Sequence, residues 1–242
     1  MLHGEQVDLF DLSFALPSEC ADQLRNSQTD IGIVPVVELA RQKLQMIPGV
    51  GIACAGAVRS ILLISKVPFA EIQTLAADSS SRTSVMLARV ILAKKYGAEP
   101  NVVAQAPSLV AMLDGADAGL IIGDPALLLD PQTLPFHVLD LGAEWTELTG
   151  LPMVFAVWCQ RAGLPQQDPR PFRDSLRYGM NCVDAIVDSE SAKRGITRQL
   201  AHDYLTRHIV FELGNREYDG MSTFLCYAAE FEHQENLRNV TV

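Results

Sequence analysis

The chain has 242 residues, 48% of them hydrophobic and 20% charged, and its formal net charge is −10 at pH 7. This composition is typical of a globular protein with one large domain or two smaller lobes, and the acidic balance argues against nucleic acid and anionic membranes as partners. An anion site in such a chain must be built from local donors, because charges are screened beyond about 8 Å at physiological salt.

The five cysteines are scattered without a CxxC pair, and the five histidines form no HExxH motif. We therefore expect neither a disulfide framework nor a bound metal. Each cysteine lies in or beside an apolar stretch, which favours buried, inert thiols. The first ten residues, "MLHGEQVDLF", do not resemble a signal peptide, and no apolar run approaches the ~18 residues of a membrane span. We expect a soluble, cytoplasmic protein.

In chain order, the first elements alternate between strand and helix. "VDLFDLSF" at 7–14 predicts a strand, and Pro17 with Ser18 marks the start of a helix. "TDIGIVPVVELA" predicts a short strand that ends at Pro35, followed by a helix. Residues 49–69 predict two strands, of which 60–65, "SILLIS", is apolar enough to be buried on both faces.

The middle of the chain continues this alternation. Another strand leads into a helix over 82–96, whose apolar residues recur at spacings of three and four and which Gly97 would end. Beyond about residue 168 the pattern turns helical to the end. The remaining predicted elements are strands in "NVVAQA", "ADAGLIIGDPALL", "FHVLDLG" and "LPMVFAVWCQR", with short helices in "PSLVAMLDG" and "AEWTELTG".

Such alternation predicts an α/β fold with a largely parallel sheet. The phrases "LRNSQTDIGIVP" and "MLDGADAGLIIGDP" echo each other as helix, turn, apolar strand and proline. They suggest two similar lobes that present strand ends to a shared cleft, where ligands of α/β proteins bind. The alternative is that the two phrases share only a common α/β pattern.

The stretch "DSSSRTS" at 78–84 crowds hydroxyl groups and one arginine at a helix start. Free N–H groups, the helix dipole, these hydroxyls and the forked Arg82 side chain can together bind a carboxylate or phosphate. The alternative is a helix cap with more polar residues than it needs. No glycine occurs in the stretch, so it is not a P-loop.

Three further positions stand at strand ends. Ser60 precedes the buried strand, where bonding to the local backbone is the simpler interpretation. Gly123 and Asp124 follow another strand, and Asp124 either caps the turn before Pro125 or serves as a base. No Ser-His-Asp spacing or paired carboxylates stand out.

Five segments, taken together and in order from Val7 to Arg161, closely resemble the menaquinone-pathway chorismate dehydratase family of the futalosine route. They are "DIGIVPVVELA", "GAVRSILLISKVP", "DSSSRTSVMLARVILAKKYG", "ADAGLIIGDPAL" and "DLGAEWTELTGLPMVFAVWCQR". The resemblance implies a two-lobed, type II periplasmic-binding-protein-like fold with the ligand in the cleft. Lobe 1 would comprise 1–70 and 141–242, and lobe 2 would comprise 71–140.

The resemblance also implies an activity. The enzyme would be a hydro-lyase that converts chorismate into 3-[(1-carboxyvinyl)oxy]benzoate and water, without metal or organic cofactor. The family's functional serine falls on Ser60, which would hydrogen-bond the substrate rather than attack it. Chorismate is a dianion and needs two carboxylate sites. The residues expected to bind it are Pro35, Ser80, Arg82, Thr83, Ser84, Gly123 and Asp124.

One departure from the family is plain. Its members open with a strand that carries an aromatic-Leu-Asn phrase, and no such phrase precedes Val7 here. We therefore expect this 242-residue chain to be of low stability and weakly active.

Other interpretations stay open. One is a non-catalytic protein of the same fold that binds a small carboxylate. Another is the sister enzyme that acts on a cyclic futalosine derivative, for which His137 would be the base. The sequence also leaves the oligomeric state open, a homodimer included.

Overall fold

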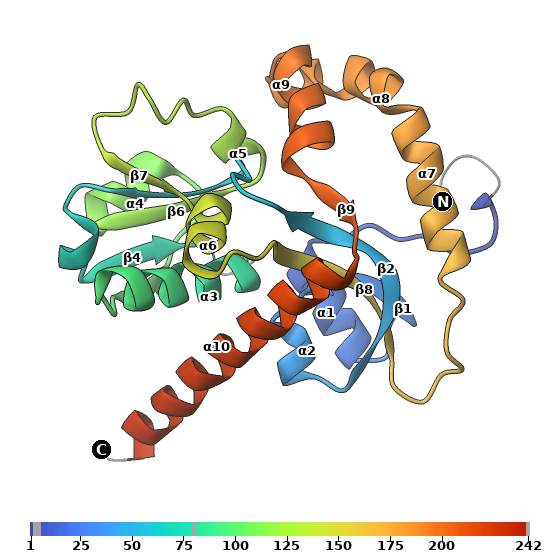
Figure 1. The fold of residues 1–242 in the computed structure, drawn as a ribbon, viewed down its shortest axis with the longest axis horizontal. Helices are drawn as coiled ribbons and strands as arrows, with labels where there is room; N and C mark the ends of the chain where they lie inside the picture. Colours follow the sequence, from blue (N-terminus) through green and yellow to red (C-terminus); the bar gives the residue numbers. More distant parts are fainter. Residues whose placement is uncertain (2–5, 79–80, 241–242) are drawn as a thin grey trace.

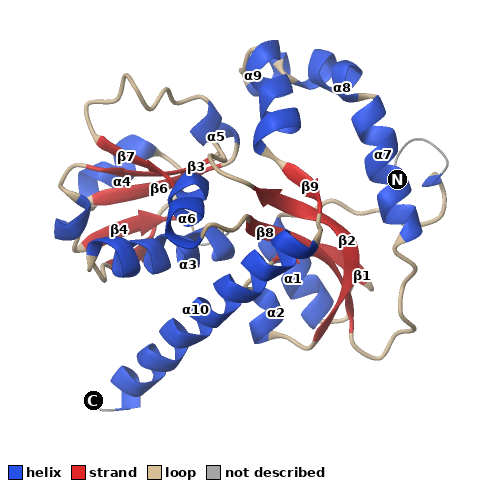
Figure 2. Cartoon of the chain, in the orientation of Figure 1, coloured by secondary structure: helices blue, strands red, loops and turns tan. Residues whose placement is uncertain are grey.

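The computed structural model of the chain describes residue 1, residues 6–78 and residues 81–240, with side chains described up to residue 233. Two sheets, the first antiparallel and the second mixed, stand side by side, each with helices packed around it (Figure 1, Figure 2). The first sheet has the strand order β1-β8-β2-β9 and the second has the order β5-β4-β6-β3-β7. The strands are β1 (Ile31–Pro35), β2 (Leu44–Cys54), β3 (Ile61–Ser65), β4 (Thr74–Ala77), β5 (Asn101–Ala104), β6 (Ala118–Ile122), β7 (His137–Asp140), β8 (Met153–Arg161) and β9 (Val210–Glu212).

The helices cover the sheets and make up most of the C-terminal third of the chain, where the sequence predicts helix throughout and the structure adds the short strand β9. Among them, η3 and η5 are single π-helical turns, and η2 and η4 are 3₁₀ turns. Their bounds are α1 (Pro17–Arg25), α2 (Glu38–Arg41), η2 (Phe69–Glu71), α3 (Arg82–Ile91), η3 (Leu92–Tyr96), α4 (Leu109–Gly115), α5 (Asp124–Leu127), α6 (Leu141–Thr149), α7 (Arg170–Asn181), α8 (Val183–Glu190), η4 (Ala192–Arg194), α9 (Arg198–Asp203), η5 (Tyr204–His208) and α10 (Asn215–Val240). None of the described helices is both long enough and apolar enough to cross a membrane.

The expected parallel sheet is wrong, because most of the described strand pairs are antiparallel. Only β4–β5 and β4–β6 run parallel. Strand β8 lies between β1 and β2 and runs antiparallel to both, and β3 runs antiparallel to β6 and β7. A chain that passes from one sheet to the other and back enters the sheets in opposite directions, which local periodicity does not reveal.

The chain crosses between the lobes earlier than the sequence predicts. Strand β3 belongs to the second sheet, so the first crossing lies between Cys54 and Ile61 rather than at residue 70. The return crossing runs from β7 through α6 into β8, near the predicted boundary at residue 141.

Helix α10 begins at lobe 1, beside β8, and runs down and away below lobe 2 (Figure 1). Its Phe224 and Tyr227 lie against the ring of Trp145, which is fully buried, at centroid distances of 6.0 and 6.1 Å. Trp145 also donates a hydrogen bond to the Pro152 carbonyl at 3.1 Å. The helix therefore packs on the segment that returns the chain to lobe 1.

Lobe 1 contains a cavity of about 1780 Å³ between its sheet and helices α7 and α8. Residues 9–15 line it together with Ile31, Trp158 and Phe172. The strand predicted at 7–14 is wrong, since this segment forms no strand, and Leu9 and Phe14 are exposed. A strand forms only where its backbone groups pair with another strand, and none of the described strands pairs with this segment.

The expectation that all the cysteines are buried is correct for only part of the set. Cys54 and Cys159 are buried, Cys20 and Cys182 are half-buried, and Cys226 is exposed on α10. The apolar neighbours of Cys226 do not bury it, because Cys226 lies on a solvent-exposed face of α10.

Candidate functional site

The strand ends of both sheets meet at the junction between the lobes. In lobe 2, the parallel strands β4 and β6 end at Ala77 and Ile122, and Ile122 pairs with Ile61 at the start of β3. In lobe 1, β1 and β2 both run antiparallel to β8, so both end toward the same side. This is the arrangement in which α/β proteins bind ligands.

Ser60 lies at this junction and is 4% exposed. Its carbonyl accepts a hydrogen bond from the Gly123 amide at 2.8 Å. Its Oγ accepts a hydrogen bond from the Tyr204 hydroxyl at 3.0 Å. The structure thus places Ser60 beside Gly123, and Tyr204, 144 residues further along the chain than Ser60, contacts Ser60.

Gly123 and Asp124 connect β6 to the short helix α5. Gly123 has φ 67° and ψ −145°, a conformation that glycine adopts without strain, and a Cβ there would meet no atom within 4 Å. Asp124 Oδ2 lies 2.7 Å from Arg194 Nη1, which comes from η4 in the C-terminal third. The Asp124 carboxylate therefore already has a cationic partner.

The segment before Ser60 is held by Asp140, the last residue of β7. Its carboxylate accepts hydrogen bonds from the Val58 and Arg59 amides at 2.9 and 2.6 Å and caps α6 through the Gly142 and Ala143 amides. Arg59 has φ 65°, which is rare for a residue with a side chain. Asp140 thus holds the first crossing and the start of the return crossing together.

The helix start at 81–84 faces lobe 1, and its hydroxyl residues are buried. Thr83 and Ser84 are 4% and 5% exposed, and Thr83 Oγ1 accepts a 3.5 Å hydrogen bond from the Val37 amide, two residues beyond Pro35. Pro35 is buried at the end of β1. Ser80, predicted as part of this anion site, lies outside the described residues.

Arg82 makes its contacts with carboxylates of lobe 1. Its Nη2 lies 2.8 Å from Asp22 Oδ2, and its Nη1 lies 3.1 Å from Glu38 Oε1. The hydrogen bond to Asp22, followed by the charge of Glu38, raises the pKa of the Arg82 guanidinium despite its partial burial. The arginine predicted to bind substrate thus joins the two lobes in this structure.

Glu38 is the centre of that junction, because its side chain is 1% exposed. Arg25 and Arg41 lie within 3.2 and 3.4 Å of its carboxylate, and Gln42 donates a hydrogen bond to it at 2.6 Å. Arg82 is the partner that comes from lobe 2. A carboxylate this deeply buried is stable only with such partners.

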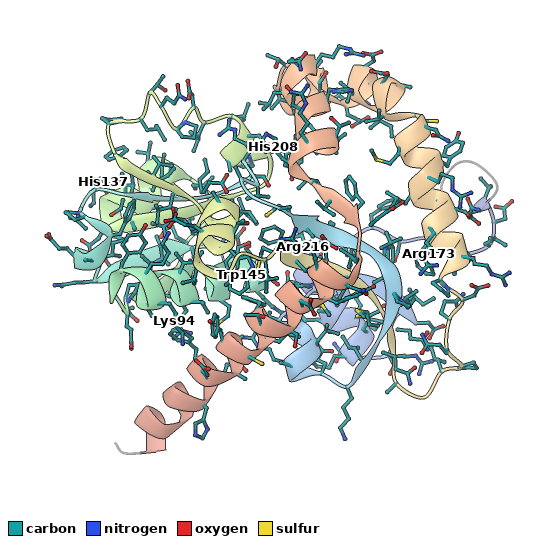
Figure 3. All side chains as sticks on the ribbon, in the orientation of Figure 1. Lys94, His137, Trp145, Arg173, His208 and Arg216 are labelled. Atoms are coloured by element: carbon teal, nitrogen blue, oxygen red, sulfur yellow. The ribbon has the colours of Figure 1, made fainter. Side chains whose placement is uncertain are left out.

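The C-terminal third contributes side chains that sequence reasoning missed. Tyr204 contacts Ser60, Arg194 contacts Asp124, and His208 Nδ1 lies 2.8 Å from the Ala57 carbonyl. Figure 3 labels His208 between α9 and β9, beside lobe 2. No motif in the tail could have identified these residues, since their roles depend on contacts 70 to 151 residues away.

His137 lies away from this site. It pairs with Ser65 at the opposite end of β3 from Ser60, and five residues of strand span about 17 Å. Its ring packs against Phe69 at a centroid distance of 5.7 Å, on the outer part of lobe 2 (Figure 3).

In the described part of the chain, no three histidine, cysteine, aspartate or glutamate side chains gather where they could hold a metal ion. The lobe 1 cavity includes none of the predicted site residues. A smaller cavity of about 220 Å³ touches Arg82 together with Arg41 and Arg89.

Comparison with known proteins provides independent information. A family model described as menaquinone biosynthesis matches residues 2–230. The chain is 27% identical over 226 residues to the chorismate dehydratase of Thermus thermophilus, covering 84% of this chain and 81% of that protein. It is 31% identical over 141 residues to the chorismate dehydratase of Campylobacter jejuni, covering 58% of this chain and 49% of that protein.

Solved structures resemble this fold at low sequence identity. A protein of Archaeoglobus fulgidus aligns over 91% of this chain and 84% of its own, with a TM-score of 0.66 and 18% identity. The periplasmic aliphatic sulphonate binding protein of Escherichia coli aligns over 93% and 76%, with a TM-score of 0.61 and 15% identity. These likenesses confirm the expected two-lobed, periplasmic-binding-protein-like α/β fold.

Proposed function

We propose that this chain, which belongs to the menaquinone biosynthesis family, is a chorismate dehydratase. The reaction is the elimination of water from chorismate to give 3-[(1-carboxyvinyl)oxy]benzoate. One ring C–O bond and one ring C–H bond break, and the departing hydroxide and proton leave as water. The ring becomes aromatic, so the driving force lies in the substrate.

The observation that carries the proposal is the position of Ser60. It is a buried hydroxyl at the junction where strand ends of both lobes meet, and Tyr204 holds it. We assign Ser60 the role of hydrogen-bonding the substrate near the departing hydroxyl. A positioned group that assists one proton transfer contributes roughly 10²–10⁴-fold.

We assign the substrate carboxylates to donors on the two sides of this junction. The first turn of α3, with Thr83 and Ser84, supplies buried hydroxyls and the helix N-terminus on one side. Gly123, with room for a close approach, lies on the other side. Arg82 would exchange Asp22, the more exposed of its two partners, for a carboxylate of the substrate.

The test is incubation of the 242-residue chain with chorismate, at enzyme concentrations high enough for weak turnover, while the aromatic product is followed by ultraviolet absorbance and mass. Ser60→Ala is the matched control, because it removes one hydroxyl and leaves the backbone bond to Gly123. We expect turnover by the unmodified chain and its loss in the variant at unchanged melting temperature.

Two results would count against the proposal. If chorismate binds, as measured by calorimetry, but never turns over, the chain is a non-catalytic binding protein of the same fold. If the Ser60→Ala chain turns over at the unmodified rate, the reaction proceeds but Ser60 does not take part. The interpretation as the sister enzyme of the pathway needs His137 as its base, and His137 lies at the far end of β3 from Ser60. The structure therefore does not favour that interpretation.

A further inference from the structure

We infer that Tyr204 is a positioning residue for the proposed reaction, holding the Ser60 hydroxyl so that its proton points toward the substrate. The inference rests on the proposed function and goes beyond it, since it assigns a role to the C-terminal third of the chain. Three observations carry it: the Tyr204–Ser60 bond, the anchoring of the turn on which Tyr204 lies, and the burial of the phenol.

The first observation is the short contact between the two hydroxyls, since Tyr204 Oη lies 3.0 Å from Ser60 Oγ. We assign Tyr204 as the donor on the relative acidity of the two groups. A phenol is the more acidic of the two and therefore the better donor. A serine hydroxyl has one proton and two lone pairs, so the bond from Tyr204 occupies a lone pair and leaves the Ser60 proton free to be donated. Without Tyr204 the Ser60 hydroxyl could rotate among its staggered positions.

The second observation is that the turn on which Tyr204 lies also contacts the segment before Ser60, through its last residue, His208. Tyr204–His208 forms the π-helical turn η5, and π-helical turns occur frequently at functional sites. His208 Nδ1 lies 2.8 Å from the Ala57 carbonyl. Because a carbonyl oxygen only accepts, Nδ1 carries the proton and donates it. Two side chains of one turn thus form hydrogen bonds with the stretch from Ala57 to Ser60, which limits how far the phenol can move.

The third observation is the half-buried position of the Tyr204 side chain. Burial raises the pKa of its phenol above the ordinary value of 10, so the phenol keeps its proton at neutral pH. The phenol is therefore a permanent donor to Ser60 in the pH range in which enzymes work.

The test is Tyr204→Phe, which keeps the ring and its packing and removes the hydroxyl alone. Tyr218→Phe is the matched control, because Tyr218 is another lobe 1 tyrosine, and its hydroxyl accepts a hydrogen bond from the Gly49 amide at 2.8 Å. We expect kcat for chorismate to fall about tenfold in Tyr204→Phe with KM nearly unchanged, because a Ser60 hydroxyl that is no longer oriented makes a weaker hydrogen bond to the transition state. Tyr218→Phe should keep the unmodified kcat.

A double variant separates a role through Ser60 from a structural role. Chorismate affinity, measured by calorimetry, should be the same in Ser60→Ala and in Ser60→Ala/Tyr204→Phe. An additional loss of affinity in the double variant, or an unchanged kcat in Tyr204→Phe, would overturn the inference while the proposed function stands. Absence of turnover by the unmodified chain would instead remove the proposed function, and the inference with it.

Discussion

The guanidinium of Arg82 in lobe 2 lies 3.1 Å from the carboxylate of Glu38 in lobe 1, whose side chain is 1% exposed. The same guanidinium reaches Asp22 at 2.8 Å. One arginine therefore joins the two lobes on one side of the junction, and the pair Arg194–Asp124 joins them on the other side. Arg82 is itself predicted from the sequence to bind substrate, and Arg194 contacts another such residue, Asp124.

Arg82→Ala should open the lobes and weaken substrate binding. We expect a larger radius of gyration by small-angle X-ray scattering, a KM for chorismate raised about tenfold, and a stability loss of about 1–2 kcal/mol, since Asp22 is 41% exposed and Arg82 is 23% exposed. Arg25→Ala is the control, because Arg25 reaches the same Glu38 from within lobe 1. Equal changes in radius for the two variants would contradict a role in joining the lobes.

Asp140→Ala should disturb both crossings between the lobes. The carboxylate accepts hydrogen bonds from four backbone amides, of which two belong to the Val58–Arg59 segment and two to the start of α6. Loss of such a cap with its charged bonds costs about 2–4 kcal/mol. Chemical denaturation measures this, and Asp130→Ala, which removes a single exposed turn bond to Gln132, should cost far less.

Gly220→Ala should be strongly destabilising. A Cβ at this position of α10 would lie 2.0 Å from the Pro152 carbonyl oxygen, so the helix would have to move off the returning segment. Gly179→Ala in α7 is the control, because its Cβ would meet no atom within 4 Å and alanine favours the helix by up to about 1 kcal/mol. Thermal melting should therefore shift in opposite directions for the two variants.

We expect the stability of lobe 2 to decrease at acidic pH because of Asp117. Its carboxylate accepts bonds from the Gln73 amide and from the amide and hydroxyl of Thr74, and these bonds lower its pKa below 3.8. A lowered folded-state pKa contributes stability that is present above the unfolded value and lost as pH falls through the folded value. The stability difference between the unmodified chain and Asp117→Asn should hold at pH 7 and shrink below pH 4. A difference independent of pH would show that Asp117 acts by shape alone.

The cysteines should differ sharply in reactivity. Burial raises the pKa of Cys54 to about 12, with a further contribution from the charge of Asp140, and burial raises that of Cys159 to about 12 as well. The thiolate is the reactive form. At pH 8 a thiol reagent should therefore label the exposed Cys226 and leave Cys54 and Cys159 unmodified until denaturant is added. Mass spectrometry of peptides identifies the labelled positions.

Local signals in the sequence were sufficient for many individual elements. The helix predicted over 82–96 is confirmed as α3 followed by η3, and Gly97 ends it with φ 67°. The buried strand at 60–65 is confirmed as β3, and the helix starting at Pro17 as α1. Each of these depends on neighbours within a few residues, so capping, turn chemistry and apolar spacing identify them.

The strand predicted at 7–14 shows where local signals end. Its apolar residues have the right spacing, but a strand forms only beside another backbone, and the described structure places a cavity between this segment and the sheet. The prediction of largely parallel strand pairs failed for a similar reason, because the direction in which a strand enters a sheet depends on which lobe the chain has just left.

The sequence by itself determined the class of the protein, two α/β lobes, and placed Ser60 and the 78–84 stretch at strand and helix ends, since these are matters of local pattern and of resemblance. Only the tertiary structure decided which side chains meet. It turned Arg82 toward Glu38, set Arg194 on Asp124, and brought Tyr204 to Ser60. Such contacts join residues that are far apart along the chain, and their geometry arises only when both lobes and the C-terminal helices have packed.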